Sequence, residues 1–431
     1  MSARDDAVPG LKRPRQVTPT FDSGHQVAAP DSPGRIDVRS SLRLFLSLDI
    51  VGSTEFKQAS RSVDAPRAIA DAWVEPFLSF YQISVEQMEA HWTRTCGAMR
   101  AVEPSNKSER FLFGTPPEFW KGAGDEVLFS KEVRSPLDAM AAIHTFLSVM
   151  KEHRARFAQK GVHLDVKGTA WLAGFPVNNA EAMLAARYEE LPPGRLDEPV
   201  AENYRLLALH RAGALKASGQ IDYVGPSVDL GFRLREHATP RRLVVSVDLV
   251  WLLCHTHDSC TDRERKRCRF LTIPHIGYDG RQGLKGILGG QPYPLLWIEA
   301  DPDNEIDRAE DAVLRRPLPG HTPTSDRVGH VSRFCDLFLN GRTALQGRPY
   351  IGGCGDPEIS IVPPEHRTRL ESIENHVNGA RDQLDALAVE DGGSGSIPAD
   401  TQAFADTLAQ AMGAQAMGAQ ATGSRGRKRR R

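Results

Sequence analysis

The sequence predicts an α+β fold, in which helices pack on a mixed sheet. The first observation behind this prediction is that predicted strands and helices alternate along the chain, with adjacent strand pairs among them. The second is size, because a chain of 431 residues of which 40% are hydrophobic can bury a substantial core. We therefore expect a globular α+β protein with one large domain or two ordinary ones.

The first half of the chain carries clear strand, turn and helix signals. LRLFLSLDI (42–50) alternates apolar residues and stops before Gly52, which predicts a strand that enters a turn. Aromatic and apolar residues recur at helical spacing from Ala65 to about Met88, which predicts a helix with a core-facing stripe. EFWKGAGDEVLFS (118–130) predicts a strand, a Gly-rich turn and a second strand. A long helical pattern follows from Pro136 to Gln159.

The second half continues this alternation around a long polar interruption. Residues from about 178 to 220 are polar with helical segments, so we expect an insertion within a hairpin. The rest predicts strands at 162–174, 221–227 and 241–249, a helix at 228–237, and a final strand pair around GLKGI (283–287) and PYPLLWIEA (292–300). We therefore place the main domain at residues 41–300.

The two ends of the chain differ in composition from this domain. Residues 1–40 are rich in Pro, Asp, Arg and Ser, which predicts a mobile, disordered leader. Residues 301–389 form a predicted helical appendage, whose apolar positions suit either a partner helix or packing on its own domain. Residues 390–431 contain GGSGS, a QAMGA repeat and the basic end GRKRRR, which predict a disordered, solvated tail.

Charge and cysteine content narrow the class of partners. Lys and Arg number 54 against 55 Asp and Glu, so no overall field favours nucleic acid or a membrane surface. No apolar stretch approaches the roughly 20 residues that span a bilayer, and the N-terminus lacks the apolar segment of a secretory signal. The 6 cysteines are irregularly spaced, which suits a reducing compartment. We therefore expect a cytoplasmic protein that binds neither nucleic acid nor membrane.

One Cys- and His-rich stretch raises the question of zinc. CHTHDSC (254–260) followed by Cys268 offers thiols and imidazoles, but its spacing fits no usual zinc-finger pattern. We favour an exposed loop with a buried cysteine over a zinc site. The sequence also lacks the GxSxG, HExxH, P-loop and dinucleotide-binding motifs, which removes several common enzyme classes.

Two aspartates, one at the end of a predicted strand and one in a predicted turn between strands, are placed as metal ligands could be. Asp49 ends the first strand, and Asp125 lies in the Gly-rich turn. Carboxylates at a strand end and at an adjacent hairpin can hold Mg²⁺ or Mn²⁺ while leaving positions free for triphosphate oxygens. Each signal has a plainer explanation, since Asp49 could cap the next helix and Asp125 could be an ordinary turn residue.

Three segments in the same order give these aspartates a family context. LFLSLDIVGST resembles the FxDIxGST motif of class III adenylyl and guanylyl cyclases, and WKGAGDEVLF is similar to the KxxGDG hairpin of that family. IDYVGPSVDLGFRL resembles its DYxGxxVNxAxRL segment. The resemblance covers roughly residues 41–299 apart from the insertion. It implies the ferredoxin-like α+β sandwich of class III cyclases and a phosphorus–oxygen lyase activity on a nucleoside triphosphate.

The resemblance implies a role for each matching residue. Asp49, the carbonyl of Ile50 and Asp125 would bind two divalent ions, Mn²⁺ or Mg²⁺, of which one activates the attacking hydroxyl and the other neutralises the phosphate chain. Arg233 would stabilise charge on the α-phosphate, because a guanidinium meets phosphate oxygens at two points. Asp229 replaces the usual Asn that orients the ribose.

Other implied roles concern the substrate and the assembly. GLKGILGGQPYPLLWIE is similar to the late strand pair of the family, where Lys285 would contact the triphosphate. Lys121 and Asp222 occupy the two places that recognise the base. Because class III cyclases are head-to-tail dimers and this chain has one copy of each motif, the resemblance implies a homodimer with two composite sites. One subunit would lend Asp49, Ile50 and Asp125, and the other would lend Lys121, Asp222, Arg233 and Lys285.

The sequence features are compatible with more than one nucleotide base in the substrate. Lys121 and Asp222 stand at the places that read adenine, which favours ATP and cyclic AMP. Glu126 in place of Gly, Trp120 before the lysine, Asp229, the insertion and the appendage instead resemble the pyrimidine cyclases of the bacterial Pycsar antiphage system. We favour UTP over CTP, with cyclic UMP as an antiviral second messenger for a separate effector protein. A third alternative is a catalytically inactive homologue that binds a nucleotide and signals, which Asp229 would favour.

Overall fold

The structure is a computed structural model and describes residues 35–391, except 60–72, 103–110, 112, 186–197, 213–218, 307–308, 310–326 and 342–346. Residues 392–431 of the predicted tail and most of the predicted leader therefore lie outside the described residues, as do the first residues of the helix expected from Ala65. None of the described helices combines the length and the apolar composition needed to cross a bilayer.

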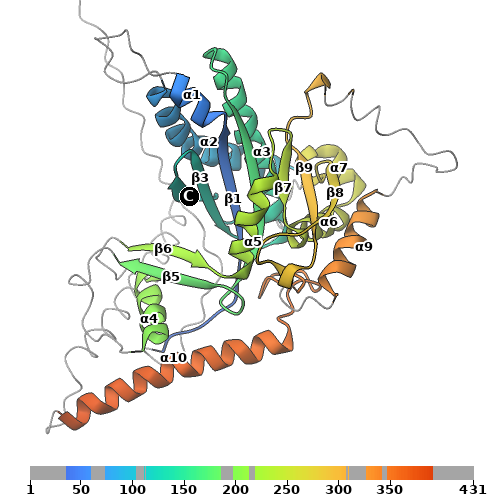
Figure 1. The fold of residues 1–431 in the computed structure, drawn as a ribbon. Helices are drawn as coiled ribbons and strands as arrows, with labels where there is room; N and C mark the ends of the chain where they lie inside the picture. Colours follow the sequence, from blue (N-terminus) through green and yellow to red (C-terminus); the bar gives the residue numbers. More distant parts are fainter. Residues whose placement is uncertain are drawn as a thin grey trace, which may run out of the picture.

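A seven-stranded mixed sheet forms the centre of the molecule (Figure 1). Its order is β2-β3-β1-β4-β7-β9-β8, and β4 and β7 run parallel while all other neighbours are antiparallel. The strands are β1 (Ser41–Val51), β2 (Glu118–Ala123), β3 (Glu126–Glu132), β4 (Asp165–Phe175), β7 (Arg242–Val245), β8 (Ile276–Gln282) and β9 (Tyr293–Glu299). With helices packed on this sheet, the predicted α+β fold class is confirmed.

A separate two-stranded ribbon and nine described α-helices complete the fold. The ribbon pairs β5 (Ala180–Ala185) with β6 (Gly219–Val224). The helices are α1 (Ser53–Ala59), α2 (Val74–Arg100), α3 (Pro136–Gln159), α4 (Pro199–Arg211), α5 (Pro226–Leu234), α6 (Val247–Ser259), α7 (Asp262–Arg267), α9 (Arg327–Leu339) and α10 (Pro364–Asp391). Helix α3 has the predicted bounds because Ser135 caps it and Pro136 fits its first turn.

The central strand β1 buries both of its faces. Its even-numbered leucines, from Leu42 to Leu48, belong to the main core, to which α2, α3 and α6 also contribute. The odd-numbered Phe45 instead joins an aromatic cluster on the opposite face, together with Trp171 of β4. Helix α5 lies on this second face, since a Cβ at Gly231 would stand 2.1 Å from the Trp171 ring. The two faces of one strand therefore carry different layers.

The Cys- and His-rich stretch is helical, so our expectation of an exposed loop is wrong. Residues 254–259 form the end of α6, because the preceding apolar run continues a buried helix rather than the predicted strand, which stops at Val245. Cys254 and Cys260 are buried, whereas the His255 Nε2 atom lies 2.8 Å from an Asp356 carboxylate oxygen. Among the described residues, no group of three or more His, Cys, Asp or Glu side chains is arranged to hold a metal ion.

The strand expected at 283–287 is also absent from that place. The partner of β9 is the earlier strand β8, and residues 283–287 form the turn between them. Gly286 has φ +79°, a conformation that interrupts a strand and that glycine adopts readily. The expected strand pair thus exists, but one of its members is displaced towards the N-terminus.

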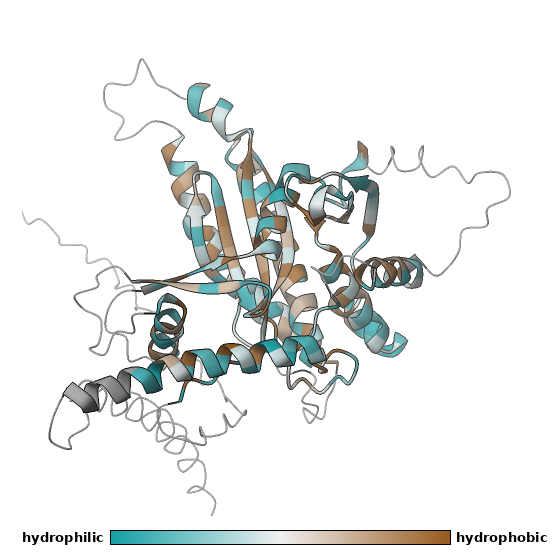
Figure 2. Cartoon of the chain, turned by 60° about the horizontal axis from the view of Figure 1, so that its bottom comes forward, coloured by the Kyte–Doolittle hydropathy of each residue, from teal (hydrophilic) through white to brown (hydrophobic). Residues whose placement is uncertain are grey.

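The insertion and the appendage pack against each other. Described parts of the insertion form β5 and α4, and α4 lies beside α10 along one side of the molecule (Figure 1). Figure 2 shows α10 as largely hydrophilic, and its few apolar side chains in the described part pack on the chain itself: Val377 contacts Ile36 and Val38. The Asn378 side chain pairs with both backbone groups of Ile36, at 3.0 and 3.1 Å. Ile36 and Val38, at the end of the predicted leader, are therefore packed against α10.

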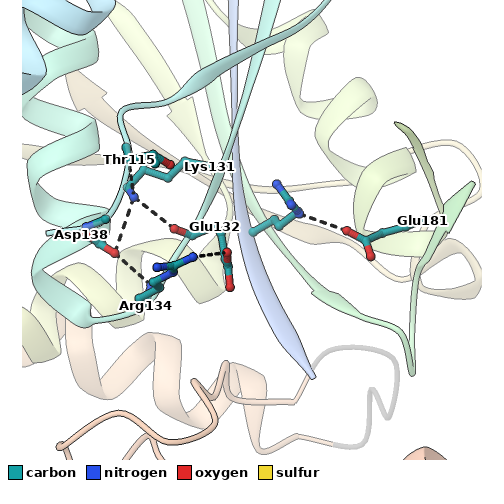
Figure 3. A network of polar contacts seen from close by, with 8 residues as sticks. Thr115, Lys131, Glu132, Arg134, Asp138 and Glu181 are labelled. Atoms are coloured by element: carbon teal, nitrogen blue, oxygen red, sulfur yellow. Dashed lines mark hydrogen bonds and ion pairs between the residues drawn. The ribbon is translucent and has the colours of Figure 1, made fainter. Parts of the chain in front are cut away.

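A buried lysine links the start of α3 to the edge of the sheet (Figure 3). The Lys131 side chain is 1% exposed, and its ammonium donates to the carbonyl of Thr115 at 2.9 Å and to that of Glu132 at 3.1 Å. Its Nζ lies 3.5 Å from a carboxylate oxygen of the fully buried Asp138, which also accepts from the backbone N–H of Arg134. Burial lowers the pKa of Lys131, and the Asp138 charge opposes this shift.

Replacing Lys131 with Met should lower the free energy of unfolding by roughly 3–5 kcal/mol, because the charge of Asp138 would stay buried without a counter-charge. The double variant K131M/D138N should recover part of this loss, since it removes both charges. Urea denaturation followed by circular dichroism measures both effects. A double variant less stable than K131M by the full cost of D138N alone would show that the two charges do not interact.

Candidate active site

The two predicted metal-binding aspartates lie next to each other at one end of the sheet. Asp49 is near the end of β1, opposite Glu126 of β3, and Asp125 lies in the turn between β2 and β3. The backbone N–H of Ile50 donates to the carbonyl of Asp125 at 3.2 Å, and the hydroxyl of Ser53 donates to the Asp125 carboxylate. The hydrogen-bonded hairpin therefore holds the two carboxylates together.

The Asp49 carboxyl sits in an unfavourable electrostatic environment. Its pKa is raised above the ordinary value, first by burial and then by the negative charges of Asp125 and Glu126. Lys167 of β4, the direct cross-strand neighbour of Asp49, opposes this shift with its Nζ 3.3 Å from Oδ2. The sequence analysis missed Lys167, although strand alternation in 162–174 could have placed it beside the β1 carboxylate.

The chemistry of this cluster fits a divalent cation. Two carboxylates and the Ile50 carbonyl at a strand end are hard oxygen donors of the kind that Mg²⁺ and Mn²⁺ prefer. Negative charge gathered in a half-buried place is costly unless a cation compensates it, and Lys167 supplies part of that charge. Only two carboxylates would coordinate, so the remaining positions would fall to water and substrate oxygens.

The two predicted base-reading residues form a direct ion pair. The Lys121 Nζ on β2 lies 2.9 Å from Oδ1 of Asp222 on β6, and the two side chains are 33% and 29% exposed. Lys121 also lies 4.0 Å above the ring of Trp120, at the edge of the aromatic cluster. Gln220 of β6 donates to the Trp120 carbonyl at 2.9 Å, which holds the ribbon across β2. The structure thus brings Lys121 and Asp222 together within one chain.

Helix α5 presents Asp229 and Arg233 to the outside. Asn179 fixes the start of this helix, because its Oδ1 accepts from the backbone N–H of Ser227 at 3.0 Å. Asp229 and Arg233 are both exposed, and the structure shows no ion pair between these two described residues, although they stand four positions apart on α5. Both side chains are therefore accessible to a ligand or to another molecule.

Lys285 lies far from the aspartates within the sheet. It is exposed in the turn that follows β8, the outermost strand on one side, whereas Asp125 lies beside β2 and β3 on the other. Four strand steps separate β1 from β8, which corresponds to about 19 Å at the usual strand spacing. The structure therefore does not bring Lys285 to the same place as Asp49 in a single chain.

A third carboxylate beside the aspartates was noticed in the sequence only as a departure from the family motif. Glu126 has a side chain that is 3% exposed, and it pairs with the guanidinium of Arg235. The hydroxyl of Ser47 donates to its other oxygen. Arg235 follows α5 directly, in the short helix η3 (Arg235–His237). Sequence alone gave no signal for this pair, because its two members lie 109 positions apart.

Comparison with known proteins yields distant structural matches only. No family model matches the chain, and no curated protein matches it. The adenylyl cyclase CyaB from P. aeruginosa is similar with a TM-score of 0.34 and 11% identity, over 61% of this chain and 95% of that one. The guanylate cyclase domain of RhGC from Catenaria anguillulae, solved with GTP, is similar with a TM-score of 0.30 and 11% identity, over 60% and 97%. These matches therefore assign no activity to this chain.

The raised pKa of Asp49 predicts how this residue affects stability. A carboxyl whose pKa is higher in the folded protein than in the unfolded chain stabilises the fold at low pH, and this contribution disappears as the pH rises through the folded pKa. Asp49→Asn should therefore make the protein at least as stable as the parent at pH 7, although it removes the contact with Lys167. The gain should shrink as the pH approaches 4.

Urea denaturation of both proteins at pH 7 and at pH 4.5 measures this difference, since the other titrating groups cancel between them. If the stability of Asp49→Asn minus that of the parent is lower at pH 7 than at pH 4.5, the expected sign of the effect is wrong. Such a result would mean that the attraction of Lys167 outweighs burial and the neighbouring carboxylates.

Proposed function

We propose that this protein is a nucleotidyl cyclase, which converts a pyrimidine nucleoside triphosphate into the 3′,5′-cyclic monophosphate and pyrophosphate. The observation that carries the proposal is the hydrogen bond from the backbone N–H of Ile50 to the carbonyl of Asp125, which holds the hairpin with Asp125 beside Asp49 at the end of β1. Both aspartates lie in segments that resemble cyclase metal motifs. The substrate we favour is UTP, followed by CTP. The product would serve as an antiphage second messenger in the cytoplasm, read by a separate effector protein.

The proposed reaction is a single in-line displacement. The 3′-hydroxyl oxygen of the ribose forms a bond to the α-phosphorus, the bond from that phosphorus to the bridging oxygen breaks, and pyrophosphate leaves with its electron pair. Two divalent ions held by Asp49, Ile50 and Asp125 would supply charge neutralisation and a lower pKa for the hydroxyl. The hydroxyl proton passes to solvent, and Arg233 would meet the charge that develops on the α-phosphate.

The exposure of the second group of residues supports a homodimer. Arg233 and Asp229 lie on the outside of α5, and Lys285 lies in the turn after β8, a strand about 19 Å, or four strand spacings, from β1. Within a single chain, Lys285 therefore cannot contact a triphosphate that is bound at Asp49 and Asp125. A head-to-tail pair of chains would complete each site with residues from both subunits.

The surroundings of the Lys121–Asp222 pair support a pyrimidine. Uracil offers a carbonyl to the ammonium and its N3–H to the carboxylate, so it can replace both halves of the ion pair. Adenine can satisfy the same two groups through N1 and its amino group, which keeps ATP as the second candidate. The rings of Trp120 and Phe232 have their centroids 4.0 and 5.8 Å from the Lys121 Nζ, and we expect them to favour a base with a single ring.

Purified protein incubated separately with ATP, GTP, CTP and UTP plus Mn²⁺ should release cyclic UMP and pyrophosphate with UTP. Asp49→Ala and Asp125→Ala should each reduce turnover by at least a thousandfold, since a metal ligand of a two-metal site is removed. Asp258→Ala, which changes an exposed aspartate at the end of α6, should leave turnover unchanged. Product from ATP alone would overturn the pyrimidine assignment, and no product from any nucleotide would overturn the cyclase.

Substitutions at the ion pair should separate base recognition from metal chemistry. Lys121→Gln and Asp222→Asn should each lower kcat/KM for UTP about tenfold to a hundredfold, because each removes a hydrogen bond to a charged group. Their folding should be little affected, since partly exposed ion pairs contribute little to stability. Steady-state kinetics with UTP and ATP measures the change. Equal kinetics for variants and parent would show that this pair does not contact the base.

A further inference from the structure

The pair formed by Glu126 and Arg235 lies between the two groups of proposed active-site residues. Glu126 is the first residue of β3 and follows Asp125 in the hairpin. Arg235 follows Leu234, the last residue of α5, and stands two positions after Arg233. A contact between these two side chains therefore connects the metal-binding hairpin with the helix that carries Arg233.

Glu126 is not placed as a third metal ligand, although it lies directly opposite Asp49. One of its carboxylate oxygens accepts from Ser47 and the other from Arg235. Each of the three neighbouring carboxylates has its own partner, because Asp49 faces Lys167 and Asp125 accepts from Ser53. The contacts of Glu126 thus occupy both of its carboxylate oxygens, one with β1 and one with the residue that follows α5.

Because Glu126 is buried, it is the fixed member of this pair, and Arg235 is the member that it restrains. Its side chain is 3% exposed, so the carboxylate needs a positive partner, whereas Arg235 is 39% exposed and could otherwise turn to solvent. A buried charge with a fixed position on the sheet therefore holds the guanidinium, and through it the end of α5. At its other end, α5 is fixed by Asn179, and at its middle by Gly231 against Trp171.

We propose that Glu126 and Arg235 form a positioning pair, which fixes α5 and its Arg233 against the metal-binding hairpin. The inference rests on the proposed cyclase function, and it adds two residues that touch neither metal nor nucleotide. In a head-to-tail dimer, α5 of one chain would serve the site whose metals belong to the other chain. Within each chain, the pair would then connect the metal ligands of one composite site with the Arg233 that serves the second site.

The first test compares Arg235→Met with the parent in turnover and in binding. The variant should lower kcat about tenfold to a hundredfold, because a displacement of the order of 1 Å at a catalytic group has that effect. The affinity for Mn²⁺, measured by the loss of the free-ion electron paramagnetic resonance signal, should stay within about twofold, since the metal ligands are unchanged. Arg235→Lys should recover part of kcat, because it keeps the charge.

A double variant separates positioning from simple destabilisation. Arg235→Met leaves the Glu126 carboxylate buried without a counter-charge, so the thermal midpoint of this variant should fall, whereas E126Q/R235M removes both charges and should regain stability. The kcat of the double variant should nevertheless stay low, because the connection to α5 is still missing. Recovery of both stability and kcat would overturn the proposal, since the pair would then matter only for folding.

The control is Arg242→Met, which breaks an ion pair with Asp279 at the far side of the sheet. Arg242 is 39% exposed, as Arg235 is, so the two substitutions remove equally accessible guanidiniums. This control should leave kcat unchanged. An equal loss of kcat in Arg242→Met would overturn a specific role of Arg235.

Hydrogen exchange decides the inference without relying on turnover. In Arg235→Met, and in E126Q/R235M, the backbone amides of α5 should exchange at least tenfold faster, while those of α3 should keep the parent rate. Unchanged exchange in α5 would overturn the positioning pair. If the parent makes no cyclic product from any nucleotide, the proposed function fails, and this measurement still tests the connection between hairpin and helix.

Discussion

Strand β1 lies between β3 and β4 in the middle of the sheet and buries both of its faces. Because side chains alternate along a strand, its leucines point to the helical layer and the residues between them point to the opposite layer. Along that second face the sequence runs from Phe45 through Ser47 to Asp49, so an apolar contact changes into a polar site within five residues. The main core thus lies on one face of β1. The aromatic cluster and the candidate site follow each other along the opposite face.

The site is held by charges that compensate one another at close range. Three carboxylates meet where β1 faces the hairpin, and each is satisfied by a different partner: Lys167, Ser53 or Arg235. Burial makes an uncompensated charge costly, so these contacts restrain the strands and α5 as well as the carboxylates. A divalent ion would join this arrangement as a further positive charge, in competition with the Lys167 ammonium for Asp49.

Local patterns predicted much of the fold and only part of the site. Alternation located β1, the glycines located the hairpin with Asp125, and the helical pattern from Pro136 to Gln159 located α3. The pairing of Glu126 with Arg235 depends on register and on how α5 crosses the sheet, which no local pattern contains. Residues 254–260 are expected in a loop only if the apolar run before them belongs to a strand. A short apolar run suits a strand or a buried helix equally well, and here it begins the buried helix α6.

In the proposed cyclase, the choice between bases would depend on space more than on hydrogen bonding. Lys121 and Asp222 already satisfy each other, so any base that enters must replace one donor and one acceptor at once. Uracil and adenine both meet that requirement, and the ion pair alone would discriminate weakly between them. The rings of Trp120 and Phe232 beside Lys121 are rigid and cannot shorten as a flexible side chain would. In the proposed cyclase, discrimination against a purine would therefore come from these rings, because Trp120 belongs to the buried aromatic cluster and Phe232 packs against it.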